Sequence, residues 1–101
     1  FWTEPDAVPA LADDGPLSFV HAPDLDVPVW WTPHPVRAPF VTAWGGGDAT
    51  AAIVGDRGPD AARLATTLAT LLGLPAAAVA ARLRAVVAHD WGADPFARGA
   101  Y

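Results

Sequence analysis

The spacing of apolar residues between positions 59 and 73 predicts an amphipathic helix. Four leucines follow the spacing i, i+4, i+7 and i+8, which places them on one helical face: Leu64, Leu68, Leu71 and Leu72. Pro59 suits the first helical position, and Asp60 suits the first turn, where the helix dipole favours a carboxylate. Gly73 suits the residue just past the helix end. We therefore expect a helix from about Pro59 to Leu72.

The pattern after this helix predicts a second short helix and then a strand. Pro75 can start the second helix, whose periodicity is obscured by alanines. From Leu83 to Trp91 the chain alternates as a strand does, so that Val87 and Trp91 share one face. A continuous helix from Pro75 to His89 is the competing interpretation.

Most of the 11 prolines lie within residues 1–39, which predicts loops with short strands between them. Leu17 to His21 is one candidate strand. Val27 to Thr32 is another, which Pro28 should place at a sheet edge because proline cannot donate to the ladder. Disorder is not expected here, because disordered segments are poor in aromatic residues and this stretch contains several.

Pro39 to Trp44 is a stronger candidate strand, with β-branched and aromatic residues bounded by proline and glycine. The three glycines that follow turn the chain, and Asp48 can cap a short helix toward Val54. Gly55 to Gly58 is a second break. Together these elements predict an α+β fold with a mixed, mostly antiparallel sheet and two or three helices. Residues 1–39 would form loops and short strands, and residues 40–101 a strand, two helices, a strand and a turn.

Composition excludes several classes of function. The 101 residues fit one small domain, and a net charge of −5 without any lysine argues against nucleic-acid binding. The absence of cysteine removes disulfides and thiolate chemistry. No stretch reaches the roughly 18 apolar residues that a membrane helix needs. There is no signal-peptide pattern, so a cytoplasmic location is the default expectation.

Candidate catalytic and metal-binding residues do not form recognisable patterns. His21, His34 and His89 are far apart and lack metal-ligand spacing, so no metal site is expected. Ser18 is not part of a nucleophile elbow. His89 and Asp90 would point to opposite faces of a strand, which argues against their acting as an acid–base pair.

The final segment, from Trp91 to Tyr101, carries the most distinctive chemistry. An Asp-Pro pair at Asp94 favours a turn, and Gly99 permits backbone geometry that other residues resist. Ala100 leaves room for a flat ligand, and Tyr101 offers a ring face and a hydroxyl that could line a pocket for an amine. From chemistry alone, an ordinary turn with both aromatic residues in a core is the alternative.

This segment resembles a pattern found late in the FAD-dependent amine oxidases, which include monoamine oxidases, polyamine oxidases and flavin-dependent histone demethylases. The shared pattern is a strand, a tryptophan, an acidic-Pro-aromatic triplet and Arg-Gly-small-Tyr, which reads here Trp91-Gly-Ala-Asp-Pro-Phe-Ala-Arg-Gly-Ala-Tyr101. Three weaker landmarks fall in the family's order: Phe1-Trp2, the strand and glycine turn of Ala43–Ala49, and the leucine-rich helix ending at Leu72-Gly73. The resemblance thus spans nearly the whole chain.

The resemblance implies that the chain is a fragment of the substrate-binding domain of such an enzyme. Tyr101 would form one wall of an aromatic cage that holds the amine, with Trp91 as its second aromatic residue near the flavin ring. Gly99 and Ala100 would also lie close to the flavin. Some monoamine oxidases bond the flavin covalently through a cysteine at the place of Ala100, so the resemblance implies a non-covalent FAD. It places no catalytic residue in this chain.

The whole enzyme would oxidise an amine to an imine by hydride transfer to flavin, with oxygen reduced to peroxide. FAD would be bound mainly outside this chain, which lacks the Gly-x-Gly-x-x-Gly fingerprint and the lysine that many members hold at the flavin. The expected partners are therefore a small-molecule amine and the FAD-binding domain of the same polypeptide, and the fragment alone should be inactive. The alternatives are a standalone protein- or peptide-binding module and an amino-acid oxidase or desaturase of the wider flavin group.

Overall fold

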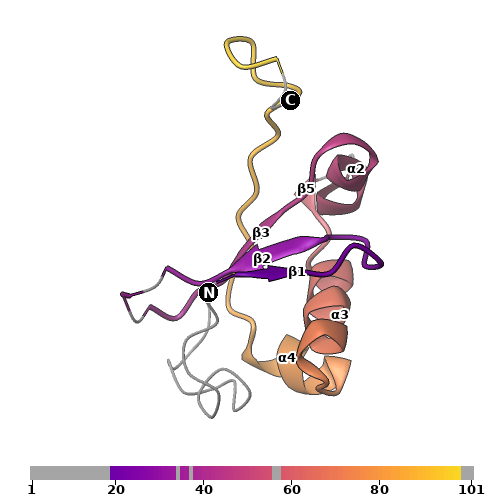
Figure 1. Ribbon diagram of the computed structural model, residues 1–101, viewed down its shortest axis with the longest axis vertical. Helices are drawn as coiled ribbons and strands as arrows, with labels where there is room; N and C mark the ends of the chain where they lie inside the picture. Colours follow the sequence, from indigo (N-terminus) through magenta and orange to yellow (C-terminus); the bar gives the residue numbers. More distant parts are fainter. Residues whose placement is uncertain (1–18, 34, 37, 56–57, 99–101) are drawn as a thin grey trace.

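The computed structural model describes residues 19–33, 35–36, 38–55 and 58–98. For residues 51, 52 and 55 it describes the backbone only. The described part confirms the expected α+β class, since it combines a three-stranded antiparallel sheet with two helices packed beside it (Figure 1). The elements in chain order are β1 (Val20–His21), β2 (Val29–Trp31), β3 (Thr42–Trp44), η1 (Gly47–Ala49), α2 (Thr50–Ile53), β4 (Val54–Gly55), β5 (Gly58–Pro59), α3 (Ala61–Leu72) and α4 (Ala76–Arg82).

The main sheet has the strand order β1-β2-β3, in which Trp30 lies opposite both Val20 and Ala43. All three strands fall inside the ranges that the sequence predicts, although each is shorter. The expectation that Pro28 puts β2 at a sheet edge is wrong, because β2 is the central strand. Pro28 precedes the first paired residue, so its missing N–H removes no ladder bond, and its carbonyl oxygen accepts a hydrogen bond from the Ala22 N–H at 2.7 Å.

The glycine turn after β3 leads into a short helical segment, as the sequence predicts. Asp48 does not cap it, because this residue lies inside η1 and Gly46 occupies the N-cap position. The Thr50 hydroxyl instead donates a hydrogen bond to the Gly45 carbonyl oxygen at 3.4 Å. The predicted break between residues 55 and 58 corresponds to the connection of the β4–β5 hairpin.

The leucine-rich helix is confirmed as α3, with ends set by local chemistry. Asp60 is the N-cap, and its carboxylate accepts a hydrogen bond from the Arg63 N–H at 3.0 Å. Pro59 belongs to β5 rather than to the first helical turn. Gly73 ends the helix with φ at 64°, a left-handed conformation that glycine adopts without steric cost. Pro75 then caps α4, so the second short helix is also confirmed.

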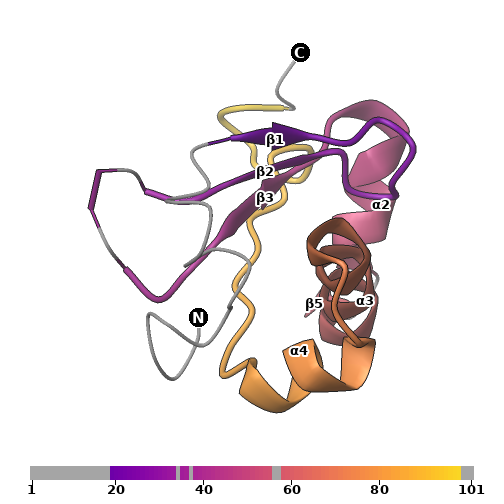
Figure 2. The ribbon, with the colours of Figure 1, turned by 60° about the horizontal axis from the view of Figure 1, so that its bottom comes forward.

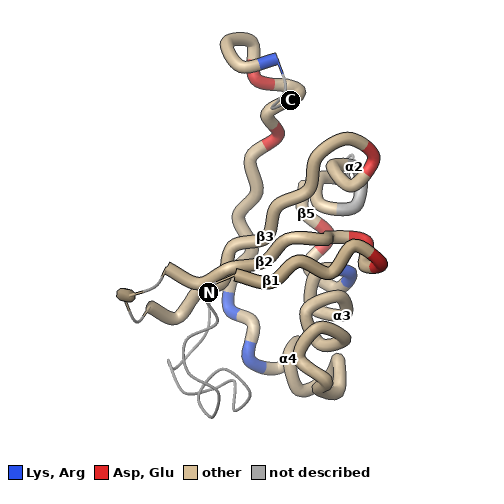
Figure 3. Tube along the Cα trace, in the orientation of Figure 1, with Lys and Arg blue, Asp and Glu red and all other residues tan. Residues whose placement is uncertain are grey.

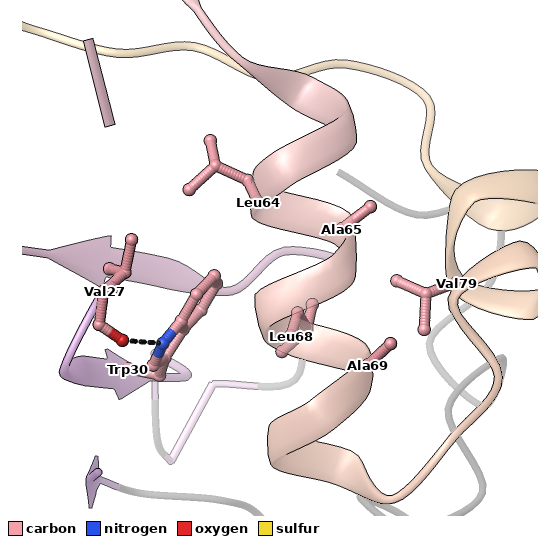
Figure 4. Close-up of a cluster of buried hydrophobic side chains, with 7 residues drawn as sticks. All are labelled: Val27, Trp30, Leu64, Ala65, Leu68, Ala69 and Val79. Atoms are coloured by element: carbon pink, nitrogen blue, oxygen red, sulfur yellow. Dashed lines mark hydrogen bonds between the residues drawn. The ribbon is translucent and has the colours of Figure 1, made fainter. Parts of the chain in front are cut away.

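The core lies where α3 meets the central strand and α4 (Figure 4). Leu64 and Leu68 from α3 pack toward Trp30, and Val79 of α4 lies beside the alanines on the adjacent part of α3 (Figure 4). The Trp30 indole N–H donates a hydrogen bond to the Val27 carbonyl oxygen at 2.8 Å, so its burial leaves no donor without a partner. The buried set is Val27, Trp30, Leu64, Ala65, Leu68, Ala69 and Val79.

The segment after α4 forms neither of the two structures predicted for it, the strand or the continuous helix. The strand from Leu83 to Trp91 is wrong, because Leu83 makes a single bridge and residues 84–90 lie outside every strand of the described chain. The continuous helix to His89 is wrong too, since Leu83 already has extended backbone angles. The segment runs next to β3 and then extends away from the body (Figures 1 and 2). Alternation of side chains favours extended backbone, but a strand also needs a neighbour to pair with.

Candidate functional site

An apolar cleft of about 800 Å³ lies between β3, the first half of α3 and the extended segment that follows α4. Trp44 and the glycine turn form one wall, and Leu64 and Leu68 contribute from α3. Val86 and Trp91 line the cleft from the extended segment. Among the described residues that line it there is no Asp, Glu or Arg, and His89 is present. Binding sites for small molecules are typically apolar and of this size, so the cleft is the candidate site.

Three tryptophans whose roles the sequence leaves open border this cleft, and they differ in burial and in their contacts. Trp30 is 3% exposed and belongs to the core. Trp31 is half-buried, and its ring stacks on Phe19 with centroids 6.5 Å apart. Trp44 is half-buried at the end of β3, against the glycine turn. The sequence signal for this wall was the Trp-Gly-Gly-Gly turn, which predicts a bend without predicting the cleft beneath it.

Of the residues predicted at the site, Trp91 is the one that the structure places. It lines the cleft and remains 50% exposed. The His89 ring approaches the Trp91 ring edge-on, with centroids 4.2 Å apart and an interplanar angle of 68°. Gly99, Ala100 and Tyr101 lie outside the described residues. The expected cage of Trp91 and Tyr101 therefore remains a prediction.

A compact turn beyond Trp91 is organised by Asp94. One carboxylate oxygen accepts hydrogen bonds from the Phe96 and Ala97 N–H groups at 2.8 and 3.1 Å, and the other lies 3.1 Å from His89 Nε2. The backbone donors, first Phe96 and then Ala97, lower the pKa of Asp94, and His89 adds to this effect. Sequence reasoning missed the His89–Asp94 pair, because it considered only the adjacent Asp90 as an acidic partner for His89. The Asp-Pro turn signal was the available clue.

We expect this turn to lose its capping bonds in acid. The folded pKa of Asp94 is depressed, so the carboxylate stabilises the turn above the unfolded pKa, and this stabilisation disappears as the pH falls through the folded pKa. The measurement is an NMR titration of the Phe96 and Ala97 amide shifts. Asp94→Asn is the control, because it keeps an oxygen acceptor but does not titrate. An acid transition of equal size in that variant would show that another group governs the turn.

Figure 3 shows the acidic and basic residues spread along the backbone trace, and no described Asp, Glu or Arg is among the residues that line the cleft. Over the described residues there is no group of three His, Cys, Asp or Glu side chains that could hold a metal ion. The N-terminus of α3, a position that often binds phosphate, is occupied by the Asp60 carboxylate. The cleft therefore suits an uncharged, flat or aliphatic group and offers no cradle for a diphosphate. None of the described helices is long and apolar enough to cross a membrane.

Comparison with known proteins identifies no relative: no family model matches the chain, and no curated protein or solved structure matches it. The site is therefore defined by its own geometry. It is a mainly apolar, tryptophan-bordered cleft on a small α+β scaffold, and the half-exposed Trp91 is part of its lining.

Proposed function

We propose that the chain is part of the substrate-binding domain of an FAD-dependent amine oxidase and that its cleft forms one wall of the amine site. The observation that carries the proposal is the position of Trp91. The C-terminal pattern resembles the flavin-site segment of those enzymes, in which the equivalent tryptophan packs near the flavin. In this chain Trp91 lines the apolar cleft and is 50% exposed. Its ring is therefore accessible to a flat partner.

The cleft has the properties that such a site requires. Its apolar lining disfavours a charged ammonium group and so favours the neutral amine. The same walls exclude water from a bound substrate. When bound, FAD would supply the redox chemistry by accepting a hydride from the carbon that carries the amine, with oxygen reduced to peroxide. The described residues would bind and orient the amine, and none of them is assigned an acid or base role.

The described residues suit the flat ring system of FAD but not its diphosphate. This is consistent with a cofactor held mainly by another domain of the same polypeptide. The Trp91 ring and the apolar walls can pack against a flat ring system. The diphosphate finds no match among the described residues, because Asp60 caps α3 and the glycine turn leads only into the three-residue η1. Ala100 has no thiol, so any flavin here would be bound without a covalent link to this residue.

Spectroscopy can test the proposal in two parts. The full-length polypeptide should purify with flavin absorbance and release peroxide when amines are added. The isolated 101-residue chain should neither perturb FAD absorbance at micromolar concentrations nor oxidise amines, because its sequence lacks the Gly-x-Gly-x-x-Gly fingerprint that holds a diphosphate. Tight FAD binding by the isolated chain would contradict the assignment of the cofactor to another domain. A flavin-free full-length protein would contradict the whole proposal.

A second candidate, a protein- or peptide-binding module without catalysis, is favoured by the exposed apolar residues of the C-terminal segment. Phe96 is 98% exposed, and Val87 is 81% exposed. Such residues are typical of interaction surfaces when they occur in groups. The neighbouring coding sequence distinguishes the amine oxidase from the binding module, since a Gly-x-Gly-x-x-Gly unit upstream favours the oxidase. Assays with panels of amines and amino acids would distinguish an amine oxidase from an amino-acid oxidase or desaturase.

A further inference from the structure

In the part of the chain that the structure describes, His89 is the one titratable side chain that lines the apolar cleft. The other ion pair of the described residues, Arg63 with Asp26 at 2.8 Å, involves no residue of the cleft lining. Histidine is the side chain that most readily exchanges a proton near neutral pH. His89 is therefore the described residue to consider for proton transfer inside the cleft.

The His89 ring is held by two neighbours. Its Nε2 lies 3.1 Å from an Asp94 carboxylate oxygen, and its ring meets the Trp91 ring edge-on with centroids 4.2 Å apart. The backbone N–H groups of Phe96 and Ala97 lower the pKa of Asp94, so its carboxylate acts only as an acceptor. The neutral His89 ring therefore carries its proton on Nε2 and its lone pair on Nδ1. Within the described structure Nδ1 has no hydrogen-bond partner.

The other charged groups near His89 do not compete for this role. The carboxylate of the adjacent Asp90 accepts hydrogen bonds from the Gly92 and Ala93 N–H groups at 2.8 and 3.2 Å. Arg98, in the turn that follows, forms no ion pair within the described structure. The described residues of β3, α2 and α3 that line the cleft carry no charged side chain.

We propose that His89, oriented by Asp94, is the base that removes a proton from the ammonium form of the substrate. The inference rests on the proposed function and deepens it. Alkylammonium groups keep their proton up to a pH of about 10, whereas the apolar walls favour the neutral amine. The Nδ1 lone pair takes one ammonium proton, the N–H electron pair stays on the amine nitrogen, and Asp94 stabilises the resulting imidazolium. The His89 side chain is 56% exposed, so it returns the proton to solvent after turnover.

Replacement of the base, compared across pH, tests the proposal in the full-length polypeptide. The probes are benzylamine, hexylamine and spermine, and the best substrate among them is used. His89→Gln retains a donor for Asp94 but cannot take up a proton, so it should lower kcat/KM near neutral pH by about 100-fold. At about pH 10.5 half of an alkylamine is already neutral, so the loss should shrink to a few-fold. Asp94→Asn should show the same pH pattern with a smaller loss.

His21→Gln is the matched control. His21 is exposed on β1 and does not line the cleft, so kcat/KM should not change. A loss in His89→Gln that is equal at both pH values would overturn the base role, because a residue that only positions Trp91 produces that result. Such a result leaves the oxidase proposal intact. If the full-length polypeptide oxidises none of the probes, the proposed function fails and the base role fails with it.

A second readout requires no turnover. Cumylamine has no hydrogen on the carbon that carries its nitrogen, so it cannot be oxidised. Its addition to the full-length polypeptide at about pH 8, above the range in which histidine ordinarily titrates, should shift the His89 ring nitrogen NMR resonances to those of a protonated ring. The resonances are identified by their absence from His89→Gln. A His89 ring that stays neutral after cumylamine is added would refute the proposal.

Discussion

Replacing Trp30 with alanine is expected to lower the free energy of unfolding by about 3 to 5 kcal/mol, the usual cost of removing a buried large aromatic side chain. Trp30 is 3% exposed and lies where β2 meets α3, so no other side chain of the small core can fill its volume. The change also removes the indole donor to the Val27 carbonyl oxygen. Small domains are stable by only about 5 to 15 kcal/mol, so this loss is a large fraction of the total. Urea unfolding followed by far-UV circular dichroism measures it.

Trp31→Ala is the matched control for that experiment. Trp31 is the next residue in the same strand, but it is half-buried and its main aromatic contact is the stack on Phe19. We expect it to cost about 1 kcal/mol, as is common for a partly exposed position. Equal losses for the two variants would show that the core does not lie on the Trp30 face of the sheet.

The second large effect follows from the proposed function and is expected at Trp91 in the full-length polypeptide. Trp91→Ala should lower kcat/KM for the preferred amine by roughly tenfold to 100-fold, because losing about 1.5 to 3 kcal/mol of apolar contact has that effect on a rate constant. The reason is that Trp91 lines the cleft and is half-exposed, so its ring can contact a bound amine. Steady-state kinetics monitored by peroxide release measures the change.

Two further variants distinguish a role in the site from a general loss of folding. Trp91→Phe keeps an aromatic face and should recover much of the activity. Phe96→Ala removes a side chain that is 98% exposed in the same segment, and it should leave kcat/KM close to that of the unmodified enzyme. If Phe96→Ala impairs turnover as strongly as Trp91→Ala does, the segment acts as a surface for another partner rather than as a wall of the amine site. Tyr101→Ala should also weaken amine turnover if that residue completes the cage.

Sequence patterns that span only a few residues predicted the helices and their ends well. The leucine spacing predicted α3, Gly73 predicted its left-handed end, and Pro75 predicted the start of α4. Helices can be predicted in this way because their hydrogen bonds and capping groups connect residues close together in the chain. The same reasoning placed Asp60 slightly inside α3, whereas it is the N-cap. Such shifts are expected, since several neighbouring residues can serve as a helix start.

Predictions that depended on a distant partner were less successful. Alternation from Leu83 to Trp91 indicated a strand, but pairing is decided by whether a neighbour is available, and the described sheet ends at β3. The pair of His89 and Asp94 forms because a turn after Trp91 brings them within 3.1 Å. The cleft likewise depends on β3 with its glycine turn, α3 and residues 83–92 coming together around it. None of these arrangements has a signature in a short stretch of sequence.

The amino-acid sequence by itself therefore determined the α+β class, the two helices and the approximate positions of the three main strands, because capping groups, apolar spacing and turn residues act locally. It also supplied the resemblance on which the proposal of a flavin near Trp91 rests. Only the tertiary structure decided that β2 is the central strand, that Trp30 is a core residue and that residues 84–90 belong to no strand of the described sheet. These outcomes depend on contacts between segments far apart in the chain, whose free energies emerge only when the segments meet.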